Sequence, residues 1–123
     1  MVQLGVRGYN YPEHLRIIRE RGITLVPPED FYTLGATKVA GRANTLYLTV
    51  DIDVLDSAFA PGSGANEPGG ITSCQLFSFV RAVAPYVDAV DIVEVNPLTD
   101  THSMTSAVAA RLVFDFIVSA SAA

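Results

Sequence analysis

The fold class of this chain is decided by residues 45–56, which read TLYLTVDIDVLD. The first part, residues 45–51, is almost continuously apolar and rich in branched and aromatic side chains. Such a run is typical of a strand in a parallel sheet that is covered on both faces. An acidic run follows the strand at once. Because parallel sheets bind ligands just beyond the carboxyl ends of their strands, we expect the chemistry of the protein at this point.

Three more segments have the composition of strands, namely residues 2–6, 23–26 and 89–95. Helix signals fill the intervals. Residues 12–22 begin with proline, carry arginines in the last turn and stop at glycine. Strands that alternate with helices predict βαβ units, so we expect an α/β fold.

Two further helices are expected in the second half of the chain. Thr72 and Gln75 have the spacing of a capping box, ahead of apolar residues that recur at helical intervals until Pro85. The last helix, residues 105–118, is apolar on several sides. We expect it to be buried against a sheet or a partner.

Composition limits the classes of protein to which the chain can belong. Its 123 residues suffice for one domain, and the 50% that are hydrophobic exceed what a domain of this size covers alone. The net charge of −5, with eight basic residues, gives no footprint for nucleic acid or an anionic membrane surface. Arg111 and Asp115 interrupt the most apolar segment, so no membrane span is expected. A single cysteine excludes an internal disulfide, which favours a cytoplasmic location.

Two aspartates stand where the strand of residues 45–51 ends. If the backbone stays extended, Asp51 and Asp53 lie on the same side of the chain, about 6 to 7 Å apart. Carboxylates at this spacing suit a hard cation such as magnesium or manganese. The alternative is a solvated aspartate turn, in which each side chain caps backbone N–H groups. Asp56 could likewise cap the loop that follows.

That loop, residues 60–70, contains four glycines and two prolines, which gives it a defined shape. It is either a plain connector or one wall of a site. Glu94 ends the last predicted strand and could offer a carboxylate to a planar cation such as a guanidinium, if this strand neighbours that of residues 45–51. The alternative for Glu94 is a structural carboxylate, and for Asn96 a turn residue before a proline.

Other reactive side chains are assigned structural roles. His14 and His102 are expected at the surface, and Cys74 is expected to be a small buried side chain. No nucleophile motif or phosphate-binding loop is present, so no catalytic residue is assigned.

Three motifs together resemble the ureohydrolase family of arginases and agmatinases, with the best fit to agmatinase-like members. They read YLTVDIDVLD from residue 47, the turns APG and EPGG at residues 60 and 67, and EVNP from residue 94. The resemblance implies a fold of three α/β/α layers. It also implies hydrolysis of a small guanidino compound, such as agmatine, to urea and an amine at two manganese ions (Mn²⁺). By this resemblance Asp51 is the carboxylate that bridges both metals, Asp53 is a ligand of one metal, and Glu94 binds the substrate guanidinium.

The chain departs from the family pattern in ways that limit its function. The family also draws metal ligands from Gly-Gly-Asp-His and Asp-Ala-His-x-Asp segments, and neither string occurs here. Ser57 and the pair Ala65-Asn66 replace the usual Pro and Thr-Pro. The resemblance therefore implies that residues 1–123 are a single partial domain, the C-terminal half of a ureohydrolase-like domain. Such a half carries an incomplete sheet of about four strands, with a strand of the missing half between two pairs.

Alone, this chain is expected to be inactive and to form a homo-oligomer or associate with the missing half. The alternatives are a non-catalytic subunit or assembly module and, with less support, a magnesium-dependent phosphate-transfer domain.

Overall fold

The structure of the chain, a computed structural model, describes residues 1–8, 11–31 and 45–121. The strands within these residues are β1 (Val2–Leu4), β2 (Thr24–Val26), β3 (Tyr47–Asp51) and β4 (Ala89–Val93). The α-helices are α1 (Pro12–Glu20), α3 (Ser73–Val83) and α4 (Met104–Ala120), and the 3-10 turns are η1 (Pro28–Asp30), η2 (Ile52–Val54), η3 (Ala84–Tyr86) and η4 (Thr101–Ser103). The predicted alternation of strands and helices is confirmed.

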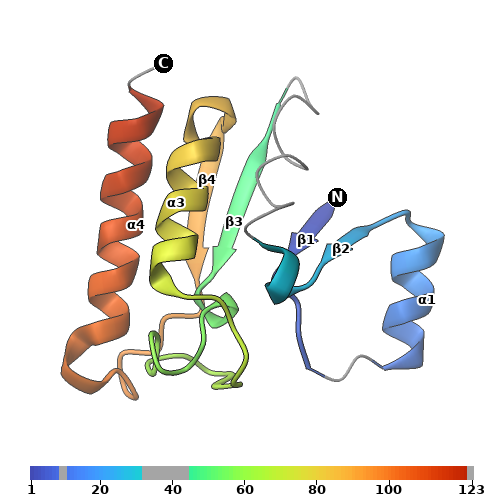
Figure 1. Cartoon of the computed structure of the whole chain (residues 1–123), viewed down its shortest axis with the longest axis horizontal. Coiled ribbons are helices and arrows are strands. Elements are labelled where there is room, and N and C mark those ends of the chain that lie inside the picture. Colours follow the sequence, from blue (N-terminus) through green and yellow to red (C-terminus); the bar gives the residue numbers. More distant parts are fainter. Residues whose placement is uncertain (9–10, 32–44, 122–123) are drawn as a thin grey trace.

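The four strands form two parallel pairs. β1 pairs with β2, and β3 pairs with β4 in a register that places Tyr47 opposite Ala89 and Asp51 opposite Val93. Within the described residues the two pairs share no ladder, so the sheet is two pairs rather than four contiguous strands. Figure 1 shows both pairs with α1 beside β2 and with α3 and α4 beside β3 and β4. The carboxyl ends of β3 and β4 therefore lie next to one another.

Residue alternation along β3 separates a core face from an open face. Val50 is buried and Leu48 packs against the core, whereas Tyr47, Thr49 and Asp51 are exposed. The core that α3 and α4 contribute to consists of Phe31, Val50, Ile52, Leu55, Ala60, Ile71, Leu76, Phe79, Val80, Val83 and Leu112. Burial of such side chains is the main stabilising term of the fold. α3 and α4 thus cover one face of the β3–β4 pair, whereas α1 lies beside β2 (Figure 1).

The start of α3 confirms the capping box. The Thr72 side chain accepts a hydrogen bond from the backbone N–H of Gln75 at 3.2 Å, and the Gln75 side chain accepts one from the backbone N–H of Thr72 at 2.8 Å. The helix buries a stripe at helical spacing, formed by Leu76, Phe79, Val80 and Val83. The prediction that Cys74 is buried is wrong, because a residue two positions before Leu76 points away from this stripe.

α3 and α4 are joined by a charged contact. Asp115 on α4 is 4% exposed, and it accepts hydrogen bonds from Arg81 on α3 and from Arg111 one turn earlier on α4, each at 2.8 Å. Two guanidinium groups thus neutralise a nearly buried carboxylate. The contact fixes the packing of the two helices.

The outer face of α4 is only partly covered. Its exposed apolar side chains are Val113, Phe114, Ile117 and Val118, which are between 48% and 60% exposed. The inner face of the helix is buried against α3 and the core, and within the described residues its outer face has no cover, so burial of that face against a partner stays a prediction. The segment Thr101–Ala120 is long and apolar enough to cross a membrane by length and composition alone. Because its two charged residues are paired with each other and with Arg81, we interpret it as a packing helix of the domain.

Candidate functional site

The acidic residues at the end of β3 belong to a turn. The strand ends at Asp51, and the chain then enters η2, which holds Asp53 at its centre. Asp51 Oδ1 accepts a hydrogen bond from the backbone N–H of Asp53 at 2.9 Å. The expectation that both side chains project from one extended segment is wrong, because the backbone changes conformation between them. The turn nevertheless keeps both aspartates beside the same cavity.

The electrostatics of this turn disfavour two unpaired negative charges. Although Asp51 is exposed as a residue, partial desolvation of its carboxylate raises its pKa, and repulsion from the Asp53 carboxylate adds to the rise, while the Asp53 N–H and the Arg7 guanidinium lower it. One oxygen of Asp53, Oδ1, is buried and has no hydrogen-bond partner. A buried carboxylate oxygen without a donor is costly unless a cation or a proton compensates it. The chemistry of this pair therefore fits an oxygen-binding divalent cation.

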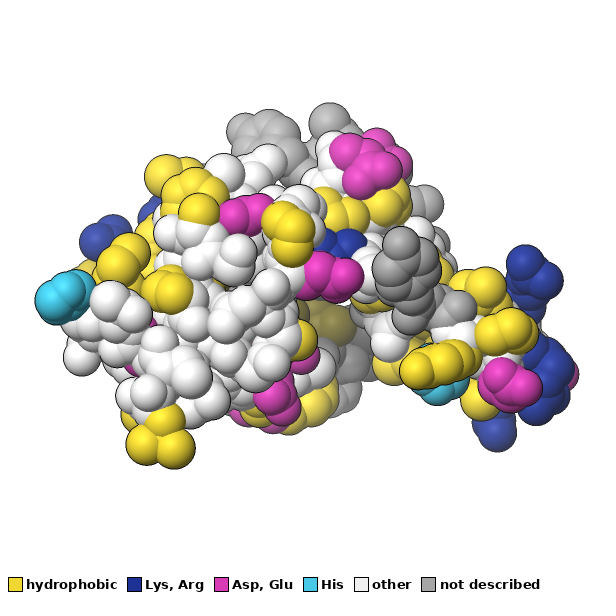
Figure 2. All heavy atoms as spheres, turned by 90° about the horizontal axis from the view of Figure 1, so that it is seen from below, with side chains coloured by type: hydrophobic (Ala, Val, Ile, Leu, Met, Phe, Trp, Pro, Cys, Tyr) yellow, Lys and Arg dark blue, Asp and Glu magenta, His cyan; other side chains and the backbone are white. Residues whose placement is uncertain are grey.

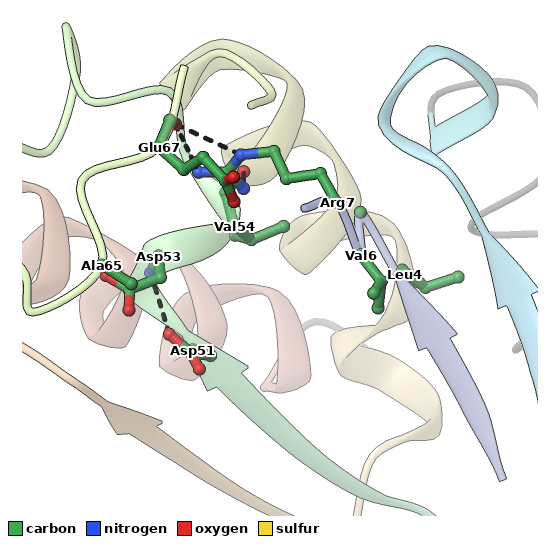
Figure 3. A pocket seen from close by; sticks show the side chains of 9 residues that line it. Leu4, Val6, Arg7, Asp51, Asp53, Val54, Ala65 and Glu67 are labelled. Atoms are coloured by element: carbon green, nitrogen blue, oxygen red, sulfur yellow. Dashed lines mark hydrogen bonds between the residues drawn. The ribbon is translucent and has the colours of Figure 1, made fainter. Parts of the chain in front are cut away.

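The two aspartates line a cavity of about 280 Å³ beyond the ends of β1 and β3. Figure 3 shows Asp51 and Asp53 on one side of it and Arg7 reaching toward Glu67 from the other. The lining residues are Leu4, Gly5, Val6, Arg7, Asp51, Asp53, Val54, Ala65 and Glu67. Figure 2 shows the molecule from below, with acidic side chains and Lys or Arg atoms between them on this face. The cavity suits a small cationic ligand.

Arg7 connects the segments around this cavity. Its Nη1 donates to the backbone carbonyl of Val54 at 3.3 Å, and its Nη2 donates to that of Leu55 at 3.0 Å. Nε and Nη2 also donate to the carbonyl of Glu67, at 3.2 and 2.8 Å. Sequence reasoning missed this residue. The signal that could have indicated it is the pair of glycines around it, Gly5 and Gly8, which both have positive φ.

The glycine-rich loop is held by its own side chains. Asp56 accepts hydrogen bonds from the backbone N–H groups of Ala58 at 3.0 Å and Gly69 at 2.7 Å, so its predicted capping role is confirmed. These two bonds lower the pKa of Asp56. The loop is closed by a bridge between Leu55 and Ile71. It is a shaped element that borders the site, as its composition predicts.

Glu94 directly follows β4, one residue beyond the ladder partner of Asp51. It is exposed and has φ of 68°, an uncommon conformation for a residue with a side chain. The loop lies against it, because Ser63 bridges to Val95 and a Cβ added at Gly64 would lie 3.7 Å from Glu94 Oε2. The condition that β3 and β4 are neighbours is thus met. A strained backbone at a site of this kind motivates a functional assignment.

Asn96 has the structural role that its position predicts. Its side chain accepts a hydrogen bond from the backbone N–H of Leu98 at 3.1 Å, which makes it a turn residue after the strand. Its own N–H donates to the carbonyl of Gly62 at 2.8 Å and so ties the two loops together.

The described residues do not bring three metal ligands together. Within the ranges 1–8, 11–31 and 45–121, no three His, Cys, Asp or Glu side chains are placed to hold one metal ion. The rest of the sequence contains none of these residue types. His14 and His102 are exposed, as predicted. The structure thus brings Asp51 and Asp53 to the cavity, whereas Glu94 stands at the end of the neighbouring strand and is not among the residues that line the cavity.

Comparison with known proteins gives consistent matches. Residues 1–119 match the sequence model of the arginase family. The chain is 40% identical over 126 residues to guanidinopropionase of Pseudomonas aeruginosa, covering 94% of this chain and 39% of that protein. It is 37% identical over 123 residues to proclavaminate amidinohydrolase of Streptomyces clavuligerus, covering 91% and 38%.

The structural comparison agrees. The fold matches the crystal structure of agmatine ureohydrolase of Thermoplasma volcanium with a TM-score of 0.88 and 26% identity, covering 98% of this chain and 42% of that one. The chain thus spans about two fifths of the length of the relatives that it matches.

Proposed function

Because the chain belongs to the arginase family and has its α/β fold, we propose that it supplies one part of the active site of a manganese-dependent ureohydrolase. The proposed reaction is hydrolysis of the guanidino C–N bond of agmatine or a similar small guanidino compound to urea and an amine. The names of the relatives described above indicate that they act on guanidino or amidino compounds, which supports this class of substrate. The observation that carries the proposal is the pair Asp51 and Asp53 at the cavity beyond β3.

Asp51 and Asp53 are the residues that would hold the metal. Asp51 keeps one carboxylate oxygen outside the hydrogen bond to the Asp53 N–H, and the buried Asp53 Oδ1 has no donor in the described structure. Both therefore have oxygen atoms suited to a hard cation. When bound, divalent ions lower the pKa of water and neutralise the charge that develops during hydrolysis.

Glu94 would orient the substrate. A carboxylate matches the planar fork of a guanidinium with two parallel hydrogen bonds, which fixes its plane as well as its position. The loop of residues 60–70 would form the wall beside it, since Gly64 lies close to the Glu94 carboxylate. Positioning of this kind reduces the entropy loss on the way to the transition state, because the substrate is already oriented when the reaction begins.

We propose that the chain releases no urea on its own. Two ligating carboxylates cannot hold a two-metal cluster, and the described residues bring no third ligand to them. Activity then needs His and Asp ligands from other polypeptide. The second candidate function is a non-catalytic assembly module, which the exposed apolar side chains of α4 favour. In either case we expect association with a second copy or with a segment that carries the missing ligands.

The proposal can be tested by a chimera. Residues 1–119 replace the matching segment of the guanidinopropionase of Pseudomonas aeruginosa, and urea release with manganese is measured on agmatine and on guanidino acids. We expect urea from at least one of these compounds. In that chimera Asp51→Asn and Glu94→Gln should each lower the rate by at least about 100-fold, because one loses a metal ligand and the other the guanidinium partner.

A matched control is Glu13→Gln on α1, an exposed acidic residue outside the cavity. Its rate should stay at that of the unchanged chimera. A chimera that shows native circular dichroism and a cooperative thermal transition, yet releases no urea, would support the assembly module instead.

A further inference from the structure

Arg7 uses its guanidinium on backbone groups although acidic side chains are close by. All three of its nitrogens donate to the carbonyls of Val54, Leu55 and Glu67. Three carboxylates line the same cavity, and the described structure gives Arg7 no ion pair with any of them. Figure 3 shows the side chain extended across the cavity toward Glu67. Arg7 thus fixes the main chain through its hydrogen bonds, while its charge acts on Asp51 without a direct ion pair.

The loop that carries Arg7 packs tightly on the same two segments. Gly5 has φ of +75°, and an added Cβ there would lie 2.4 Å from Val54 Cγ2. Gly8 has φ of +85°, and an added Cβ there would lie 2.6 Å from Glu67 Oε2. Each glycine therefore lets the backbone approach a residue whose carbonyl Arg7 binds. The placement of Arg7 is fixed from both sides.

We propose that Arg7 is a positioning residue that holds the turn η2, and with it the carboxylate of Asp53, in the geometry that binds a divalent cation. Asp53 lies between two anchors, the hydrogen bond of its N–H to Asp51 and the contact of Arg7 with the carbonyl of Val54. A lysine keeps the charge but lacks the fork that reaches two segments at once. The inference rests on the proposed function, because it assumes that the two aspartates bind metal.

Two effects of Arg7 on metal binding have opposite signs. Its positive charge weakens the binding of a cation nearby, so its removal alone would strengthen binding. Its contacts preorganise the ligands, so their loss weakens binding, and residues that orient metal ligands typically change affinity by about 10- to 100-fold. The direction of the change therefore shows which effect dominates.

The test is a titration of the full 123-residue chain with Mn²⁺, in which electron paramagnetic resonance measures the concentration of the free ion at each step. Arg7→Met and Arg7→Lys should each weaken binding by about tenfold or more, since both lose the fork. Arg81→Met is the matched control, because Arg81 also ties two elements together but lies on α3. It should leave the affinity unchanged. Wild-type or tighter binding by the Arg7→Lys chain, which keeps the charge and loses only the fork, would overturn the proposal.

A second measurement does not depend on metal. Hydrogen exchange of the Asp53 amide reports the turn itself, and it should be faster in both Arg7 variants than in the wild type or the Arg81 variant. If Arg7→Met does not fold, Arg7→Lys carries the test, and wild-type affinity and exchange in that variant would contradict the proposal. Binding that Asp51→Asn does not weaken would refute the metal site and hence both proposals. Binding that Asp51→Asn weakens but the Arg7 variants do not would refute the role of Arg7 alone.

Discussion

Asp51 and Asp53 are locked together by one hydrogen bond, from the backbone N–H of Asp53 to Oδ1 of Asp51 at 2.9 Å. The same turn leaves Oδ1 of Asp53 buried and without a donor. The arrangement holds two negative charges beside a cavity, where they destabilise the folded state unless a cation joins them. The stability of the chain should therefore respond to divalent metal through these two residues.

Metal should raise the thermal stability of the wild-type chain. At a manganese concentration tenfold above the dissociation constant, binding to the folded state adds about 1.4 kcal/mol, which is several degrees in the midpoint. Asp53→Asn should abolish this rise, because it removes a charged ligand. Differential scanning fluorimetry with and without manganese measures the effect, and an equal rise in the variant would place the bound ion elsewhere.

Acid should weaken the start of α4 through Asp100. Burial raises the pKa of Asp100, but hydrogen bonds from the Ser106 side chain and from the backbone of Ser106 and Thr105 outweigh it and lower the pKa to about 2. Because this lies below the ordinary value of 3.8, the carboxylate stabilises the fold above pH 3.8, and the stabilisation is lost as the pH falls toward 2. Asp100→Asn should lower the midpoint of urea unfolding at pH 7.

The difference between wild type and Asp100→Asn should shrink as the pH approaches 2. Unfolding curves at several pH values between 2 and 7 measure it. A difference that is constant over this range would mean that the charge of Asp100 does not stabilise the folded chain.

Gly62 should not tolerate a side chain. A Cβ at this position would lie 2.5 Å from the Cβ and 2.7 Å from the Cα of Asp100, so the loop or the start of α4 has to move. We expect Gly62→Ala to cost about 3 kcal/mol in the free energy of unfolding, at the upper end for overpacking. Gly22→Ala is the control, since Gly22 has positive φ but open space around it, and it should cost only about 1 kcal/mol. Equal costs would show that the loop is not packed on Asp100.

The contact between α3 and α4 should depend on Asp115. Its carboxylate is nearly buried between Arg81 and Arg111, so Asp115→Ala leaves donors without an acceptor and should cost about 2 kcal/mol. Arg16 forms an exposed pair with Glu20 on α1, and Arg16→Ala should cost less than about 0.5 kcal/mol. Chemical unfolding of both variants measures the costs, and a similar small cost for both would mean that the α4 carboxylate is effectively solvated.

Local signals made most of the elements predictable. The capping box at Thr72 and the proline and glycine that bound residues 12–22 act within a few residues, so the sequence shows them directly. Sequence placed Asp51 and Glu94 at the ends of strands but left open whether those strands are neighbours, and the pairing of β3 with β4 meets that condition. The fold class needed nothing beyond the alternation of strands and helices.

The predictions that failed depended on information outside the local pattern. The extended placement of Asp53 assumed that alternation continues past the end of β3, and nothing in the spacing marks where a strand becomes a turn. Arg7 was missed because its carbonyl partners lie 47 to 60 residues away. The outer face of α4 is apolar by sequence, and within the described residues no element covers it, because the local pattern does not say what packs on a helix.

The most direct test of the account is a map of manganese binding on the ¹⁵N-labelled chain. Paramagnetic broadening of amide signals should begin at residues 51–54 at the lowest manganese concentrations, should extend to Gly64 and Ala65, and should be weaker at Asp88, which precedes the other end of β4. Asp51→Asn should remove it. Broadening that begins at other acidic residues, such as Glu13 and Glu20 on α1, or that survives in the Asp51→Asn chain, would contradict a metal site at the end of β3.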